Sequence, residues 1–342
     1  MNHEEINRIK GALIGAFIGD ALAVGCHWYY DIEQMREVCG EWIDDYTQAQ
    51  KGHYHEHQKA GDSSQSGYIL MLMLKSLIKN KGYLQEDFCQ TLERELFTKI
   101  DGTPMGGIGG YTSQSIREVY HKRKQGIPWD KVATDVDNTE ALERNIAIAL
   151  AYAFDEQKMA THIYHNTKLT QDDEMLVAQN VAYGAVLSQL IQGEKLDTQI
   201  SSKLMRLVKA RKLPFHTVTS DNLSAPNGRE KKRESAINIS SPDALLSPSY
   251  MAEAVNDEDI QINPAWKVSL VYGMPCAIYH ILPASYYLGS RFKDDFEAGV
   301  LHALNGGGQN MARAMLTGAL IGAQVGFDAI PKRFIDGLSD KE

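Results

Sequence analysis

The sequence is poor in cysteine and has no excess of positive charge. Its four cysteines are scattered along 342 residues without any CxxC pair: Cys26, Cys39, Cys89 and Cys276. This spacing suits neither a disulfide framework nor a zinc site, so we expect buried, reduced thiols in a cytoplasmic protein. The formal net charge of −9 and the pI near 5.7 argue against nucleic acid and anionic membranes as partners.

The sequence also lacks the pattern of a secretory leader or of a membrane span. Residues 1–10 carry Glu4 and Glu5, with no basic segment before the apolar stretch. The apolar run at 11–24 is shorter than the ~20 residues that cross a bilayer, and it contains Asp20. We therefore expect no membrane partner.

Alternating patterns typical of β-strands are nearly absent, with weak candidates only at 216–219 and 236–240. Helical periodicity dominates instead, and it predicts an all-α protein. A long helix over 171–192 is predicted to begin with a capping box of Thr170 and Asp173. The other predicted helices cover about 2–24, 67–79, 86–98, 112–123, 140–154, 196–209, 267–280 and 292–304.

The stretch from 214 to about 264 differs from the rest, because it is rich in Ser, Asn, Pro and charged residues. It is either a long surface loop with a solvated basic run at 229–233, or a lid over a cleft. We therefore predict a single domain over 1–342 with a polar excursion at about 214–264.

The hexapeptide GALIGA occurs twice, at 11–16 and at 318–323. In each copy three glycines are spaced four residues apart, which places them on one face of a helix. Each interior glycine costs a helix about 1 kcal/mol relative to alanine, so close approach of another backbone or a ligand must compensate. We expect the first and last helices to pack together beside a polar cleft.

Four polar clusters interrupt the segments with helical periodicity, at 19–31, 53–67, 101–114 and 305–313. The last three lead into predicted helices, and two of them are rich in glycine. Glycine-rich turns before helices can offer backbone N–H groups to phosphates. Each cluster alone is weak, since glycine before a helix is also ordinary turn chemistry.

Taken in order, these segments resemble the ADP-ribosylglycohydrolase family. Residues 11–21 (GALIGAFIGDA) match its opening GALIG-x-x-x-GDA, and 307–323 match its closing GGDTDT-x-x-x-x-x-GA-x-x-GA. Residues 141–152 and Thr161-His162 resemble its central segments. The resemblance covers essentially the whole chain, and it implies a compact all-α fold, an orthogonal helical bundle in one domain. It further implies two Mg²⁺ ions between the first and last helices, which hold the ribose diol of ADP-ribose and assist hydrolysis.

The chain departs from the family at the residues that carry this chemistry. The family's TDDT falls on Gly61-Asp62-Ser63-Ser64, and its GGDTDT falls on 307–312, which reads GGQNMA. The glutamate that follows GDA falls on or near His27. Because Mg²⁺ prefers several hard oxygen ligands, we expect either no cofactor or one weakly bound Mg²⁺ at Asp62.

The pattern is closer to a side branch of the family that includes selenoprotein J and certain eye-lens crystallins. Proteins of that branch resemble this chain in HW-x-YD and KAGD segments, which stand here at 27–31 and 59–62, and in an arginine at Arg313. The resemblance predicts Asp62 and His27 as catalytic residues. It predicts as ligand-binding residues Asp20, Ser63, Ser64, Gly106, Gly107, Gly109, Gly307, Gly308, Gln309, Asn310 and Arg313.

Two histidine patterns allow alternative interpretations. His27 could act as general acid or base in place of the missing glutamate, or be a half-buried residue that is hydrogen-bonded to Asp31 or Asp62. The alternating histidines of HYHEH, at 53–57, would share one side of a strand and could bind a transition metal. We favour a polar loop at the cleft mouth for them.

Arg313 follows the glycine loop by one helical turn. We predict that it pairs with Asp62 or Asp20 and so replaces a metal cation by an internal salt bridge. Trp28 and Tyr111 could stack on an adenine ring, although burying apolar area is their commoner role.

Three functions therefore compete. The first is hydrolysis of an ADP-ribosyl N- or O-glycosidic bond. The second is binding of ADP-ribose or a related nucleotide, a small-molecule ligand, with hydrolysis altered or lost. The third is a non-catalytic structural role. The missing carboxylates favour the second, and the sequence predicts no oligomeric state.

Overall fold

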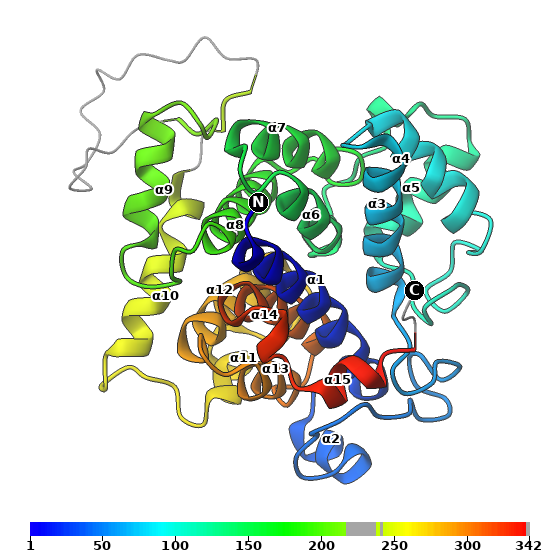
Figure 1. The fold of residues 1–342 in the computed structure, drawn as a ribbon. Coiled ribbons are helices and arrows are strands. Elements are labelled where there is room, and N and C mark those ends of the chain that lie inside the picture. Colours follow the sequence, from blue (N-terminus) through cyan, green and yellow to red (C-terminus); the bar gives the residue numbers. More distant parts are fainter. Residues whose placement is uncertain (217–236, 240–241, 340–342) are drawn as a thin grey trace.

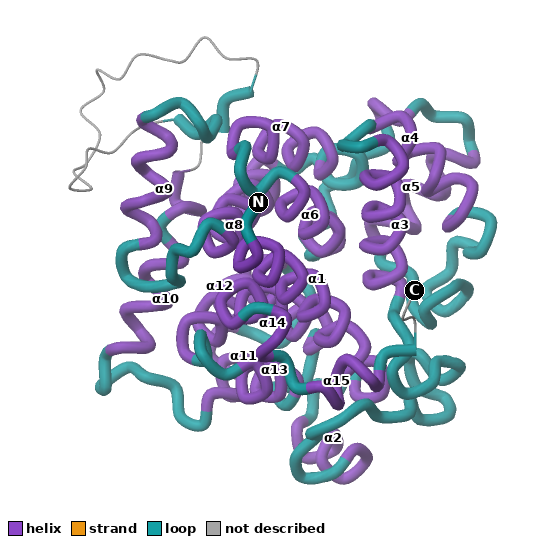
Figure 2. The backbone as a smooth tube through the Cα atoms, in the orientation of Figure 1, coloured by secondary structure: helices purple, strands orange, loops and turns teal. Residues whose placement is uncertain are grey.

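The structure is a computed structural model that describes residues 1–216, 237–239 and 242–339. These residues form helices joined by loops, with no strand among them (Figure 2), so the all-α prediction is confirmed. The α-helices are α1 (His3–Ala23), α2 (Ile32–Cys39), α3 (Gln65–Asn80), α4 (Gln85–Thr91), α5 (Gln114–Lys124), α6 (Glu140–Ala151), α7 (Glu156–Thr167), α8 (Glu174–Ile191), α9 (Ile200–Lys209), α10 (Ser247–Asn256), α11 (Val268–Tyr272), α12 (Ile278–Arg291), α13 (Phe296–Leu304), α14 (Asn310–Val325) and α15 (Lys332–Gly337).

Helix α1 begins with a reciprocal cap and runs into the core. The Asn2 Oδ1 accepts the Glu5 N–H at 2.9 Å, and the Glu5 carboxylate accepts the Asn2 N–H at 2.7 Å. The segment His3–Cys26 is long and apolar enough to cross a membrane, and 78% of its apolar window is buried inside the protein. Its apolar character is therefore used in the core of the fold.

The two GALIGA segments lie against each other, as predicted from their glycine spacing. A Cβ atom on any of the three α1 glycines would collide with a carbonyl oxygen of α14. The three pairs are Gly11 with Gly322, Gly15 with Gly318, and Gly19 with Ala314. Figure 1 shows α1 crossing the centre of the molecule beside α14. Backbone packs directly on backbone here, and we call this contact the glycine seam.

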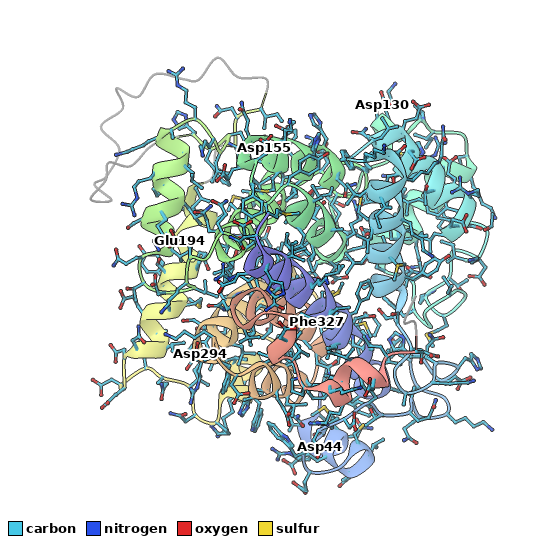
Figure 3. The ribbon with its side chains drawn as sticks, viewed as in Figure 1. Asp44, Asp130, Asp155, Glu194, Asp294 and Phe327 are labelled. Atoms are coloured by element: carbon cyan, nitrogen blue, oxygen red, sulfur yellow. The ribbon has the colours of Figure 1, made fainter. Side chains whose placement is uncertain are left out.

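The remaining helices surround the glycine seam (Figure 1). Helices α12 and α13 pack on α14, α8 and α7 pack on α6, and α3 joins the group through α6. Helix α10 packs on α12 and α9. Side chains fill the spaces between the ribbons, while acids such as Asp130, Asp155 and Glu194 lie at the periphery (Figure 3). Most buried apolar side chains form one large cluster, and a smaller second cluster lies among α11, α12 and α13.

Several predicted boundaries are wrong for local physical reasons. Helix α8 begins at Glu174 because Asp173 alone caps it, accepting the Leu176 N–H at 2.7 Å. The Thr170 hydroxyl instead donates to Glu140 at 2.9 Å. The single helix predicted over 267–280 is two helices, because Gly273 takes a φ of +115° after α11.

The segment predicted as a polar excursion is partly helical. Helix α10 lies within it and contacts α12, which the sequence pattern did not predict. Of the weak strand candidates, Ile239 forms one isolated bridge with Phe215. Residues 217–219, 236 and 240 of these candidates lie outside the described residues, as does the basic run at 229–233 within the segment for which a surface loop or a lid was predicted.

Candidate functional site

A cavity of about 100 Å³ opens at the point where four helices begin. The residues that precede the first turns of α3, α5, α6 and α14 all line it, namely Ser64, Ser113, Thr139 and Gln309. Helix N-termini carry a partial positive charge, so their convergence favours polar or anionic ligand groups. The other lining residues are His27, Trp28, His55, Gln65, Ser66, Tyr111, Gln114, Val136, Asp137, Asn138, Glu140, Glu143, Cys276 and Met311.

A chain of hydrogen bonds joins two buried histidines to Gln309. His55 Nδ1 lies 2.7 Å from the carbonyl oxygen of Gly109, and His55 Nε2 lies 2.8 Å from Nδ1 of His27. On its other side, His27 Nε2 contacts the side-chain amide of Gln309. His27 follows α1 and Gln309 precedes α14, so this chain joins the two helices of the glycine seam at the cavity.

The hydrogen-bond partners fix the tautomers of both rings. Because the carbonyl of Gly109 can only accept, His55 carries its proton on Nδ1 and accepts from His27 on Nε2. Burial lowers the pKa of His55 to about 4, and burial together with His55 holds the pKa of His27 well below its usual range. Gln309 Oε1 faces His27 Nε2, and because neutral His27 can only accept at Nε2, we assign the amide in the flipped orientation, with its nitrogen as the donor.

Asp20 lies one layer behind the cavity wall. Its carboxylate accepts the Ser64 N–H at 2.9 Å and the Ser64 hydroxyl at 2.5 Å. Burial nevertheless raises the pKa of Asp20 to about 6, because desolvation outweighs the hydrogen bonds from Ser64 and Gly67. Asp20 therefore holds the start of α3 in place and does not line the cavity.

The first turn of α6 brings two carboxyl groups to the cavity in opposite environments. Glu140 is held by the guanidinium of Arg144 and by the hydroxyl of Thr170 at 2.9 Å. Glu143 has no basic partner among the described residues, and it accepts a hydrogen bond of 2.6 Å from the Thr139 hydroxyl. Burial, assisted by the charges of Glu140 and Asp20, raises the pKa of Glu143 to about 7. Glu140 is therefore a paired carboxylate, whereas Glu143 is a buried carboxyl group with a raised pKa, which is a feature common at functional sites.

Aromatic rings form another part of the wall. The Trp28 ring stacks on His27 with centroids 4.3 Å apart and meets Tyr111 edge-on at 4.1 Å. Trp28 has a φ of +65°, a backbone conformation that is strained for a bulky residue. The Nε1 of Trp28 and the Oε1 of Gln65 are buried without a hydrogen-bond partner among the described residues. The wall therefore contains a strained residue, Trp28, and two unpaired polar atoms.

Of the residues predicted for the site, the structure brings His27, Ser64 and Gln309 to the cavity and places Asp20 behind Ser64. The others are absent from the cavity wall: Asp62, Ser63, Gly106, Gly107, Gly109, Gly307, Gly308, Asn310 and Arg313. Asp62 sits in a neighbouring turn, where its carboxylate accepts the Lys59 N–H at 2.8 Å.

The glycine-rich loops pack against backbone. A Cβ on Gly109, whose φ is +80°, would collide with the backbone nitrogen of Gln65. The Gly308 N–H donates to the carbonyl of Tyr29 at 2.7 Å, and the Gly308 carbonyl accepts the Trp28 N–H at 3.0 Å. These loops therefore support the wall from behind.

The predicted pairing of Arg313 with Asp62 or Asp20 is wrong. Arg313 is fully buried, and within the described part of the chain it forms no ion pair. Its guanidinium donates to the carbonyls of Ala303 at 2.9 Å and Gly307 at 2.6 Å. A guanidinium suits this place because carbonyls at the C-terminus of α13 are unpaired and partially negative. Arg313 thus clamps the glycine loop that precedes Gln309.

The histidine interpretations also need correction. His27 contacts His55 and Gln309, and its predicted hydrogen bond to Asp31 or Asp62 is wrong, because Asp31 caps α2. The HYHEH segment is a loop, as favoured. Only His55 enters the wall, His53 Nε2 lies 2.8 Å from the His27 carbonyl, and His57 is exposed.

The donor set does not fit the pair of Mg²⁺ ions that the family implies. Gln309 is engaged by His27, and the thioether of Met311 is a poor ligand for a hard cation. The Asp62 carboxylate lies outside the wall. No group of three or more His, Cys, Asp or Glu side chains could hold a metal ion in the part of the chain that the structure describes. We therefore derive no chemistry through a metal.

The sequence analysis missed Asp137, Glu143 and Gln65. A signal for Glu143 was present, because Glu140 and Glu143 stand one helical turn apart at the start of the largely apolar segment 140–152 (EALERNIAIALAY). Carboxyl groups on an apolar helix are buried, and buried carboxyl groups are often functional. Gln65 and Asp137 carried no comparable signal.

Comparisons with known proteins cover nearly the whole chain. The sequence profile described as ADP-ribosylglycohydrolase matches residues 1–342. An uncharacterized protein of Archaeoglobus fulgidus is 23% identical over 335 residues, or 98% of this chain and 92% of that protein. Crystallin J1A of Tripedalia cystophora is 22% identical over 344 residues, or 97% of this chain and 92% of the crystallin. A solved structure described as an ADP-ribosylglycohydrolase-related protein complex has a TM-score of 0.62 and 15% identity, covering 99% and 95% of the two chains. The predicted resemblance is confirmed, including that to a crystallin.

Proposed function

Because the chain belongs to the ADP-ribosylglycohydrolase family, we propose that its cavity binds the ribosyl part of ADP-ribose or a related nucleotide without a divalent metal ion. Metal-assisted hydrolysis of ADP-ribosyl bonds is altered or lost in this protein. A small-molecule ligand is thus its partner, and no cofactor is required.

One observation carries this proposal. Gln309 stands where the family pattern has a metal-ligating carboxylate, and its amide is engaged by His27 in the chain His55–His27–Gln309. Burial keeps both imidazoles neutral at physiological pH. A neutral hydrogen-bonded chain thus occupies the position of an anionic ligand set, which disfavours a dication.

The same cavity keeps features suited to a sugar. Four helix N-termini and several hydroxyl and amide side chains offer donors and acceptors. The aromatic wall of Trp28 and Tyr111 offers an apolar face. These features support ligand binding more than a purely structural role, for which Crystallin J1A is the precedent among the relatives.

Calorimetry tests the proposal directly. ADP-ribose and free ribose are titrated into the protein in the presence of EDTA and then with added Mg²⁺. We expect binding of ADP-ribose that is unchanged by the chelator. Tight binding only with Mg²⁺ would favour the metal-dependent hydrolase, and no heat under either condition would favour the structural role.

A blocking variant locates the binding site. Gln114 is exposed at the cavity rim, so Gln114→Trp narrows the opening without disturbing the core. We expect this variant to weaken ADP-ribose binding at least about tenfold, about 1.4 kcal/mol. Gln90→Trp, at an exposed position on α4 that does not line the cavity, is the matched control and should bind like the wild type.

A further inference from the structure

We propose that Glu143 and Asp137 form an acid–base pair that cleaves a ribosyl N- or O-glycosidic bond without a metal ion. Glu143 donates a proton to the leaving group, and Asp137 activates a water molecule. The inference rests on the proposed function, since it requires a ribosyl group in the cavity. It assigns the chemistry to residues outside the family motifs of this chain.

The surroundings of Glu143 suit a proton donor. Its side chain lines the cavity and is 4% exposed, and the hydroxyls of Thr139 and Ser66 hydrogen-bond its carboxyl group. No lysine or arginine pairs with it among the described residues. With a pKa of about 7, a large fraction of Glu143 is protonated at neutral pH. A general acid works best when its pKa lies near the working pH.

The surroundings of Asp137 suit a base. Asp137 lines the same cavity but is exposed at its opening, where water can approach. Its carbonyl oxygen accepts the Ile278 N–H at 2.8 Å, which fixes the backbone on which the carboxylate stands. The carboxylate itself has no hydrogen-bond partner within the described ranges, so it is available to water.

Both carboxyl groups line the same cavity as the thiol of Cys276. Burial, followed by the charges of Asp137 and Glu143, raises the pKa of this thiol. Glu140 is the competing candidate for the base. Its oxygens are occupied by Arg144 and Thr170, whereas the Asp137 carboxylate has no such partner among the described residues.

Enzymes that cleave glycosidic bonds by acid–base catalysis typically use two carboxyl groups whose environments keep one protonated and the other ionised. As the bond from the anomeric carbon to the leaving oxygen or nitrogen breaks, that atom takes the proton of Glu143. A water oxygen bonds to the anomeric carbon and gives its proton to Asp137. After the products leave, Asp137 releases that proton to solvent and Glu143 regains one, so the cycle consumes only water.

Other titratable groups around Glu143 must be considered for its pH dependence. They are Asp20 on α1, Glu140 on α6, Asp137 before α6, Cys276 before α12, and His27 and His55 in the wall. Burial lowers the pKa of both histidines and raises the pKa of the thiol. Asp20, with a pKa of about 6, titrates just below Glu143. We therefore expect activity to fall as Glu143 loses its proton above about pH 7.

A leaving-group series tests the acid. The substrates are phenyl and 2,4-dinitrophenyl ribofuranosides, each as both anomers, with the whole protein in EDTA. Phenolate needs a proton to leave and dinitrophenolate does not. We expect Glu143→Gln to lower kcat/KM about 10²–10⁴-fold for the phenyl riboside, with less than about tenfold loss for the dinitrophenyl riboside. The fall of kcat/KM above pH 7 should disappear with it.

Asp137 is tested by the same assay with a neighbouring control. Asp137→Asn should lower kcat/KM for both ribosides by about 10²-fold or more, since water activation does not depend on the leaving group. Asp135→Asn changes an exposed acid two residues away that does not line the cavity, and it should keep wild-type activity.

Three results would overturn the assignment, and they differ in meaning. Equal losses on both ribosides for Glu143→Gln would show a structural role for this residue. Ribosides that bind in calorimetry but are not hydrolysed by the wild type would remove the acid–base pair and leave the proposed function standing. Ribosides and ADP-ribose that do not bind at all would remove both.

Discussion

The glycine seam and the cavity are built by the same two helices but depend on opposite features. Along the seam, α1 and α14 touch through backbone because side chains are missing, as at Gly15 and Gly318. At the cavity end the helices are joined through side chains, in the chain from His55 through His27 to Gln309. The glycine seam depends on residues without side chains, whereas the cavity depends on particular functional groups.

This difference explains how the fold can be kept while the chemical groups in the cavity change. The seam has no room for a change, since a single Cβ meets a carbonyl oxygen. The cavity wall can exchange one polar group for another while the helix starts remain capped, as Ser64 caps α3. A protein can thus keep the fold of the family and have different polar groups in its cavity.

Filling the seam should have the largest effect. Gly15→Ala places a methyl group against the carbonyl of Gly318 and the ring of Phe296, so the helices must move apart. We expect the free energy of unfolding to fall by about 3 kcal/mol or more, although alanine favours the helix. Urea denaturation measures this change. Lys10→Ala, at an exposed position on the same helix, is the control and should stay within about 0.5 kcal/mol of wild type.

A pH-dependent effect on stability should come from the cavity. The pKa of Glu143 rises from 4.5 to about 7 on folding, so its contribution is complete below pH 4.5 and is lost as the pH rises through 7. Glu143→Gln removes the buried charge. We expect the variant to be more stable than wild type by up to about 3 kcal/mol near pH 8, with little difference near pH 5.

Urea denaturation at both pH values checks this expectation. The exposed Glu86→Gln variant is the control, because removing a solvated charge should give no such pH dependence. A Glu143→Gln gain of equal size at both pH values would mean that packing, and not the buried charge, causes it.

The fold could be predicted because its signals are local. The spacing of Gly11, Gly15 and Gly19 fixes a helix face, and its repetition at the other end of the chain supplies the partner face. Helix boundaries were harder to predict. Whether Thr170 or Asp173 caps α8 depends on Glu140, a residue of a distant segment, which accepts the hydrogen bond of the Thr170 hydroxyl.

The site could be predicted only in part, because its residues come from seven separate segments. His27, Ser64 and Gln309 lie in recognisable motifs and do meet in the cavity. The prediction for Arg313 was wrong because a sequence suggests a carboxylate for any buried cation, whereas the carbonyls of Ala303 in α13 and of Gly307 in the following loop become apparent as partners only in three dimensions. Asp137 carried no pattern at all.

The clamp formed by Arg313 links the two regions, and a double-mutant cycle sharpens its role. Arg313→Met should lower stability by about 2 kcal/mol, because two buried carbonyls lose their donors. Since Arg313 does not contact Asp20, adding Asp20→Asn should change stability additively, within about 0.5 kcal/mol. A coupling of about 3 kcal/mol, measured by urea denaturation, would restore the ion pair that the structure contradicts.

The smallest expected effect is on metal binding. The experiment tests whether the fold binds Mg²⁺ when carboxylate ligands are restored by mutation. The triple variant Ser63→Asp, Gln309→Asp and Met311→Asp restores carboxylates at three positions where the family resemblance implies metal-binding segments. Without metal it should be less stable than wild type, because the new charges repel one another. With Mg²⁺ at about ten times its dissociation constant, binding should return about 1.4 kcal/mol, visible as a rise in Tm. Sodium chloride at matched ionic strength controls for screening.

An equal Mg²⁺-dependent rise in the Tm of the wild type would show that the present cavity already holds the ion. A rise confined to the variant would show that the donors at these three positions, and not the glycine seam, decide whether this fold binds a metal.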